Sequence, residues 1–314
     1  AISKYSKNMV ISQKLNVKGN YDENGKPVNQ ALLPESKREY GAYDSSKLLI
    51  DGIIGRFSEL GIPRRSVYIF SYDFRKSNSE NSEKLNKFIN DVLEANPNYS
   101  QVDVVAHSMG GLVLSSYVNA NGSDKLRRII TAATPYEGAT RMIQATLTSK
   151  VTDNIGGNFA LKYLGGFSQD IKTSYPSIAQ LMPTKRYFNS TVNSTGNVSS
   201  LFKTYKDEGF IAKPTLVVGM TYDDYYNINK KLFKNLYDEA VGFHNSIIRN
   251  NTNILATLDK SYFVIGTGEK TVTGLTYDEN GITNLTYDNG GDGTVPLSSE
   301  NMIGYLDNLP SGRT

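Results

Sequence analysis

The regular alternation of strand and helix patterns over residues 46–132 constrains the fold of this chain most. Short apolar runs typical of buried strands alternate with stretches whose apolar side chains recur at helical spacing. Parallel strands joined by crossover helices produce this pattern. The sequence therefore predicts an α/β fold, with a mostly parallel central sheet covered by helices on both faces. In chain order the predicted elements are helix 46–60, strand 66–71, helix 80–95, strand 102–106, helix 111–118 and strand 127–132.

The alternation stops at Pro135. Residues 135–213 are rich in glycine, serine, threonine, asparagine and tyrosine, and they follow neither the helix nor the strand period. A structureless loop of that length is rare inside a compact domain. We therefore expect a core formed by residues 1–134 and 214–314, interrupted by a cap or lid over 135–213. Within the later core segment the predicted elements are strand 214–220, a helix around 229–249, strand 262–266 and a hairpin at 271–287.

Composition excludes several classes of function. The 314 residues include 34 lysines and arginines against 31 acidic residues, and the net charge of +3 is spread without a basic block. This balance argues against a nucleic-acid partner. There is no cysteine, which excludes thiol catalysis, and with only two histidines we expect no metal site. The segment GTGEKT (266–271) lacks the glycine that precedes the lysine of a phosphate-binding loop, so no cofactor is expected.

The segment VDVVAHSMGG (102–111) is the strongest chemical signal in the sequence. Ser108 ends a predicted strand and opens a predicted helix, as the nucleophile does in a G-x-S-x-G elbow, with Ala106 in place of the first glycine. In such a turn the serine Oγ stands above the sheet, and the backbone N–H of Met109 faces the developing oxyanion. Ser108 is therefore the predicted nucleophile and Met109 the predicted oxyanion donor. The alternative is a serine in an ordinary tight turn.

The elbow resembles that of bacterial lipases, and further segments resemble the lecithin:cholesterol acyltransferase-like family. These segments follow the order of that family over most of the chain, with Phe74 where tryptophan is usual. The resemblance implies an α/β-hydrolase fold with an inserted cap. It also implies transfer of an acyl group from a lipid ester to an alcohol or to water. The segments are FSYDFR (70–75), ATPYEG (133–138), YPSIAQLMP (175–183) and GDGTVP (291–296).

The same resemblance implies that Asp292 is the acid of a catalytic triad, which holds the catalytic imidazole in the required tautomer. Its glycine-rich surroundings at 290–293 suit a tight loop in which a carboxylate can be aimed. An ordinary Asp-Gly turn is the alternative interpretation. Asp223 and Asp224, which follow the predicted strand 214–220, are alternative acids.

The base of the triad is harder to place. The triad order in this fold is serine, acid, histidine, but no histidine follows Asp292. His107 precedes the nucleophile and leaves the elbow in the wrong direction, which indicates a packing role. His244 lies on a predicted helix (237–250) ahead of the acid, where a residue at the edge of the core is the better interpretation and a relocated base the alternative. We therefore expect the base beyond Thr314.

The second oxyanion donor is also missing from the sequence pattern. This fold takes that donor from a loop after an early strand, and residues 1–45 contain no such strand and loop. We expect this element before Ala1, so that the natural protein is longer at both ends.

Together these features predict a serine esterase or O-acyltransferase that forms an acyl-enzyme on Ser108 from a lipid or carboxylic ester. One alternative is an α/β-hydrolase-fold surface or binding protein that no longer catalyses, because the base is missing. The other alternative is a carboxylesterase of small soluble esters. Contact with a membrane surface or lipid aggregate, and a secreted or cell-surface location, are further expectations.

Overall fold

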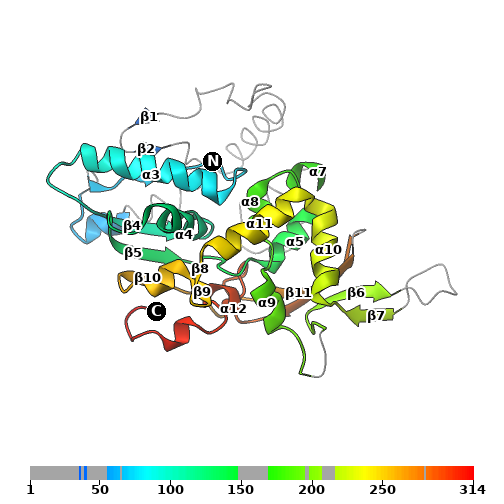
Figure 1. The fold of residues 1–314 in the computed structure, drawn as a ribbon. Helices are drawn as coiled ribbons and strands as arrows, with labels where there is room; N and C mark the ends of the chain where they lie inside the picture. The colour runs from blue at the N-terminus through cyan, green and yellow to red at the C-terminus, as the bar shows by residue number, and fades with distance from the viewer. Residues whose placement is uncertain are drawn as a thin grey trace, which may run out of the picture. The chain divides into compact units, whose positions relative to one another are not determined.

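The chain divides into two compact units, residues 1–73 and 74–314 (Figure 1). The residues that the computed structural model describes are 35–36, 39–40, 55–63, 66–147, 169–194, 198–206, 216–278 and 281–314.

In the first unit the described backbone includes a three-stranded sheet. Its order is β1-β2-β3, with β1 antiparallel to β2 and β2 parallel to β3. Residues 55–59 are helical, in agreement with the predicted helix 46–60, whose first nine positions lie outside the described residues. The strands are β1 (Glu35–Ser36), β2 (Glu39–Tyr40) and β3 (Ile69–Phe70), the last within the predicted strand 66–71.

Three parallel strands form the first sheet of the second unit, in the order β10-β5-β4 (Figure 1). Their apolar, β-branched sequences favour strands, and each coincides with a predicted one. Because the three strands run the same way, their carboxyl ends lie along one edge, where His107 pairs with Ala132 and Ala132 with Val264. The strands are β4 (Val102–His107), β5 (Leu126–Ala132) and β10 (Ser261–Val264).

Two helices, α3 and α4, pack against each other, and α4 also contacts β4. Helix α3 (Asn78–Glu94) begins after Ser77, whose Oγ accepts a hydrogen bond from the N–H of Glu80 at 3.1 Å. The carboxylate of Glu80 forms an ion pair with Lys76 at 2.6 Å. Helix α4 (Gly110–Asn121) carries an apolar stretch and two serines over residues 111–118, all of which are buried.

The second sheet has four strands in the order β12-β11-β6-β7. The antiparallel pair β11 and β12 confirms the predicted hairpin at 271–287. The predicted strand at 214–220 is present as β7, but its partner is β6, to which it runs antiparallel. The strand is thus correct and its pairing differs, because an apolar run does not specify the strand beside which it will lie. The strands are β6 (Phe202–Lys206), β7 (Leu216–Gly219), β11 (Thr271–Asp278) and β12 (Gly281–Asp288).

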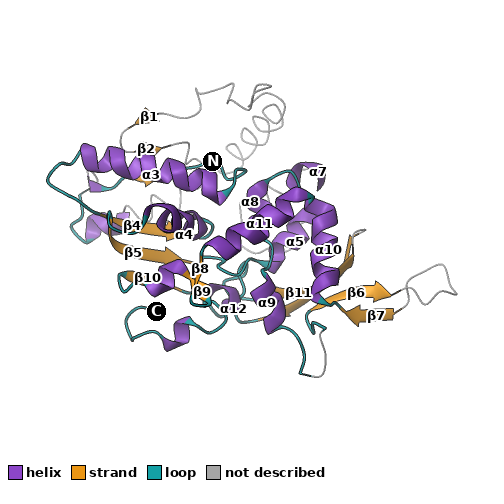
Figure 2. Ribbon diagram, in the orientation of Figure 1, coloured by secondary structure: helices purple, strands orange, loops and turns teal. Residues whose placement is uncertain are grey.

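Helices gather beside this second sheet (Figure 2). The single helix predicted around 229–249 is wrong: the chain breaks at Lys234, which has a φ of 56°, and forms two helices. The first of them begins with a capping box between Thr221 and Asp224. The helices are α5 (Thr140–Leu147), α7 (Gln169–Lys172), α8 (Pro176–Gln180), α9 (Lys185–Ser190), α10 (Tyr222–Phe233) and α11 (Asn235–Ser246). Shorter elements are β8 (Ile248–Arg249), β9 (Thr252–Asn253), the 3-10 helices at Ile254–Thr257 and Leu306–Asn308, and α12 (Leu297–Glu300).

Aromatic side chains from α9, β6 and α10 form the centre of the hydrophobic core beside this sheet. The ring of Phe202 is fully buried, with its centroid 5.5 Å from that of Phe188 and 5.3 Å from that of Tyr225. Tyr187 packs edge-on against it at 6.1 Å. Aromatic residues of the predicted cap segment therefore pack in one core with Tyr225, which belongs to the later core segment.

Candidate active site

Ser108 occupies a strained turn between β4 and α4. Its φ is 52°, in the left-handed region that side chains other than glycine rarely adopt. A backbone hydrogen bond fixes the turn to the end of β5: the N–H of Ser108 donates to the carbonyl oxygen of Ala132 at 2.8 Å. A non-glycine residue keeps such a conformation only where the surrounding structure imposes it, and such residues cluster at functional sites. The strand–turn–helix context and the backbone angle are both those of a nucleophile elbow.

The backbone beyond Ser108 leaves an N–H group available. Met109 is the N-cap of α4, and within the described part of the chain its N–H donates to no acceptor. An unsatisfied N–H at a helix N-terminus attracts negative charge, because the helix dipole adds to the hydrogen bond. The geometry is suited to an oxyanion that develops beside Ser108.

Gly111 shows how tightly the elbow is packed. A Cβ at this position would overlap the side chain of Thr134, which follows β5. The sequence predicts close packing of this glycine against a strand; the neighbour is instead the loop that follows the next strand. A glycine is required at this position because α4 and that loop approach each other too closely for a side chain.

Asp292 lies in a loop that is held in place by its own side chain. Its Oδ1 accepts hydrogen bonds from the N–H groups of Thr294 and Val295, both at 2.7 Å. A backbone bridge to Glu269 fixes the other side of the loop. The loop approaches the carboxyl end of β10, where a Cβ on Gly266 would overlap the Cβ of Asp292. The structure therefore places this carboxylate at the same edge of the parallel sheet as Ser108.

His107 connects these two elements electrostatically. Desolvation lowers the pKa of this imidazole, and the nearby negative charge of Asp292 opposes that effect. Because His107 immediately precedes Ser108, the interaction shows that the Asp292 loop and the elbow are neighbours.

His244 sits in a different environment. It is 8% exposed on α11, and its Nε2 is 2.7 Å from the carbonyl oxygen of Gln180. Burial lowers the pKa of this imidazole to about 4, and the bond to Gln180 only partly opposes the shift. The Gln180 side chain in turn accepts two hydrogen bonds from Asn78, each 2.8 Å long. Within the described residues no hydrogen bond joins His244 to Ser108 or Asp292.

The alternative acids lie on the first turn of α10. Asp224 accepts hydrogen bonds from the N–H and hydroxyl of Thr221 at 2.9 and 2.7 Å, and so completes the capping box. Asp223 occupies the same first turn. Negative charge at this position stabilises the helix N-terminus, which gives both residues a structural role.

The buried state of His244 makes stability depend on pH. A histidine with a pKa of about 4 in the folded protein and about 6.5 when unfolded binds its proton less readily when folded. The free energy of unfolding is therefore expected to decrease by on the order of 3 kcal/mol as the pH falls from 6.5 to 4. The variant His244→Gln should lose this component in urea unfolding measured across that range. Equal pH dependence in both proteins would contradict it.

Sequence reasoning does not identify Glu137, although it lies inside ATPYEG. Its side chain is 1% exposed and forms an ion pair of 2.8 Å with Arg186 on α9, and the hydroxyl of Thr184 donates to it as well. Burial raises the pKa of this carboxyl, and the charge of Arg186 opposes the shift. The cluster ties the loop after β5 to α9. No local pattern signals it, because the partners are distant in sequence.

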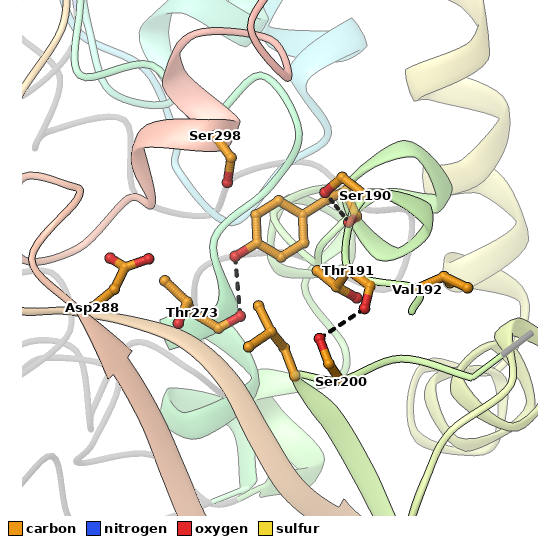
Figure 3. A pocket seen from close by; sticks show the side chains of 9 residues that line it. Ser190, Thr191, Val192, Ser200, Thr273, Asp288 and Ser298 are labelled. Carbon is orange, nitrogen blue, oxygen red and sulfur yellow. Dashed lines mark hydrogen bonds between the residues drawn. The ribbon is translucent and has the colours of Figure 1, made fainter. Parts of the chain in front are cut away.

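A polar cavity of about 370 Å³ lies elsewhere, between α9, the residues just before β6, the hairpin strands and α12 (Figure 3). Its hydroxyl groups mostly bond to their neighbours: Tyr187 donates to the carbonyl of Thr273 at 3.0 Å, and Ser200 to that of Thr191 at 2.9 Å. The residues that line it do not include Ser108 or Asp292. These bonds stabilise the walls of the cavity.

Comparison with known proteins bears on the family and on the fold. The family model described as lecithin:cholesterol acyltransferase matches residues 42–304. No curated protein matches the chain. A chain in the crystal structure of the Tle4–Tli4 complex is similar with a TM-score of 0.50 and 15% identity, over 96% of this chain and 71% of that one. The α/β-hydrolase fold predicted from the sequence is thereby confirmed.

Within the described residues, no helix has the length and apolar character needed to cross a membrane. The family match supports an enzyme that transfers acyl groups or hydrolyses lipids. It covers most of the chain, including the elbow and the Asp292 loop. The chain therefore belongs to the lecithin:cholesterol acyltransferase family.

Proposed function

We propose that this chain is a serine esterase or O-acyltransferase, acting on a lipid or carboxylic ester through an acyl-enzyme on Ser108. The observation that carries the proposal is the φ of 52° at Ser108, in a turn that follows a parallel strand and opens a helix. Strain at a serine in this context serves to expose its Oγ to a substrate.

The proposed reaction has two halves. The Oγ of Ser108 attacks the ester carbonyl while a histidine removes its proton, and the Met109 N–H stabilises the oxyanion that forms. Collapse of this intermediate releases the alcohol, which takes the proton from the imidazolium, and leaves the acyl group on Ser108. Water or an acceptor alcohol then attacks the acyl-enzyme in the same way and regenerates the serine.

Asp292 is proposed to orient the base. Its Oδ1 is occupied by the two backbone N–H groups of its own loop, whereas within the described residues Oδ2 accepts no hydrogen bond. An imidazole N–H could therefore bind Oδ2 without disturbing the loop. A carboxylate held in this way fixes the tautomer and stabilises the imidazolium.

We propose that the base is a histidine from outside these 314 residues. His244 has its Nε2 at the Gln180 carbonyl and a pKa of about 4, too low for a base at neutral pH. His107 directly precedes the nucleophile in β4 and is better suited to packing against the Asp292 loop. The second oxyanion donor is likewise proposed to come from a segment before Ala1.

The domain division is also a proposal. We assign residues 1–134 and 214–314 to the core and 135–213 to a cap that shields the acyl-enzyme. Helices α5, α7, α8 and α9 lie in that cap segment, and the Glu137–Arg186 pair attaches one of them to the loop after β5. Exclusion of water by such a cap would favour transfer to an alcohol over hydrolysis.

Labelling with a fluorophosphonate tests the function. The natural protein and the 314-residue chain are treated in parallel, and the adduct is located by mass spectrometry. Labelling of Ser108 in the natural protein alone supports a base outside the chain. Labelling in both, lost in His244→Gln, would identify His244 as the base and correct this proposal. No labelling in either would favour the non-catalytic binding protein.

Substrate class is tested separately. Turnover of long-chain and short-chain p-nitrophenyl esters is compared in the same protein. Preference for long chains supports a lipid substrate, and preference for short chains would favour a carboxylesterase of small esters.

A further inference from the structure

A second buried carboxyl group lies beside Asp292. Glu300, the last residue of α12, is 2% exposed. Its Oε2 accepts a hydrogen bond from the N–H of Gly266 at 2.9 Å. Its Oε1 is buried and has no hydrogen-bond partner among the described residues. A buried carboxylate oxygen without a partner is costly, which favours the protonated acid.

The side chains of Asp292 and Glu300 both lie next to Gly266. It follows β10, and a Cβ placed on it would overlap the Cβ of Asp292 and lie 3.5 Å from the Oε1 of Glu300. The two carboxyl side chains therefore lie against the same backbone position, at the carboxyl end of a strand of the parallel sheet. Like-charged groups this close disfavour double ionisation.

Among the described residues, no cation forms an ion pair with Glu300 to compensate a negative charge there. Burial raises the pKa of Glu300 to about 8; the Gly266 N–H opposes this shift, and the charge of Asp292 adds to it. The other titratable group that faces it is Tyr136, a buried phenol in the loop after β5 whose own pKa burial raises. At neutral pH Glu300 is therefore an uncharged acid.

We propose that Glu300 is a positioning residue for the active-site acid: it holds the Gly266 segment against the Asp292 loop and leaves Asp292 as the single negative charge there. This inference rests on the proposed function of Ser108 and Asp292. While Glu300 keeps its proton, the carboxylate of Asp292 can interact with the base undisturbed. When Glu300 ionises, the two carboxylates repel each other across Gly266 and displace the loop that carries Asp292.

We therefore expect the reactivity of Ser108 to decrease as the pH rises above about 8. With a group of pKa about 8 that must stay protonated, the active fraction falls about tenfold between about pH 7 and pH 9. Glu300→Gln keeps the size and the acceptor for the Gly266 N–H but cannot ionise. We expect this variant to label at Ser108 within about twofold of the natural protein near pH 7, and to lose the alkaline decrease.

The experiment measures the rate of fluorophosphonate labelling at Ser108 between about pH 6 and pH 10 in the natural protein and in Glu300→Gln. Glu83→Gln, at an exposed position on α3, is the matched control and should keep the alkaline decrease. The infrared band of a protonated carboxyl, present at neutral pH and absent from Glu300→Gln, reports the ionisation directly. If Glu300→Gln does not fold, the natural protein alone gives the test. The inference holds if the carboxyl band and the labelling rate decrease over the same pH range, and it fails if they decrease over different ranges.

The outcomes separate the two proposals. Labelling of Ser108 with the same alkaline decrease in Glu300→Gln would overturn the role of Glu300 and leave the proposed function intact. A carboxyl band that is missing from Glu300→Gln but does not change with pH in the natural protein would do the same. Absence of Ser108 labelling in the natural protein would overturn the proposed function, and the positioning role with it.

Discussion

Replacing Ser108 by alanine is expected to reduce ester turnover by about 10⁴-fold or more, because the proposed acyl-enzyme forms on the hydroxyl that this variant lacks. The fold should survive, since the hydroxyl of Ser108 makes no hydrogen bond within the described residues and the turn is held by backbone contacts. Turnover of a p-nitrophenyl ester and fluorophosphonate labelling measure the effect. Ser100→Ala, at an exposed position before β4, is the control and should retain full activity.

Glycine at the same position separates chemistry from strain. Ser108→Gly should be as inactive as Ser108→Ala but more stable than it by about 1 kcal/mol, because glycine adopts a φ of 52° without steric cost. Urea unfolding of the two variants gives the difference. Turnover that persists in both variants would contradict the whole mechanism, and a more stable alanine variant would contradict the strain at the elbow.

Replacing Phe202 by alanine is expected to decrease the free energy of unfolding by about 3–5 kcal/mol. The side chain is fully buried between Phe188 and Tyr225, so its removal leaves a cavity in the centre of the second unit's core. Neighbouring rings are themselves fixed by hydrogen bonds, such as that from the hydroxyl of Tyr225 to the Pro183 carbonyl at 2.7 Å, which limits collapse into the cavity.

Urea unfolding of Phe202→Ala measures this loss. Tyr99→Ala is the control, because its ring is 69% exposed and its removal should change stability by less than about 0.5 kcal/mol. A loss below about 1 kcal/mol in Phe202→Ala would mean that the aromatic cluster is not part of the cooperative core. The expected result would show that residues of the proposed cap segment stabilise the whole second unit.

Much of the fold follows from patterns short enough to read in the sequence. The runs of valine and isoleucine in β4 and β5 predict strands, and Ser77 marks the start of α3 because its hydroxyl caps a backbone N–H. The turn at Ser108 was predictable for the same reason. The chain must pass directly from strand to helix there, and only small residues fit around such a turn.

The pairing of segments that are distant in the sequence was harder to predict from the sequence. The strand at 214–220 was expected to rejoin the core alternation and instead lies beside β6 in an antiparallel sheet. The break at Lys234, with positive φ, has no glycine or proline to signal it. Both depend on which surfaces meet after the chain collapses, and a local apolar pattern is compatible with several partners.

The sequence by itself determined the elements that arise from local constraints: the elbow at Ser108, the parallel alternation and the turn that carries Asp292. Only the tertiary structure decided the electrostatic environments: that His244 is buried against the Gln180 carbonyl, and that Glu300 lies beside Asp292. The physical reason is the distance along the chain over which each kind of interaction acts. Strand, turn and cap formation depend on neighbours a few residues away, whereas desolvation and charge coupling depend on groups brought together by the whole fold.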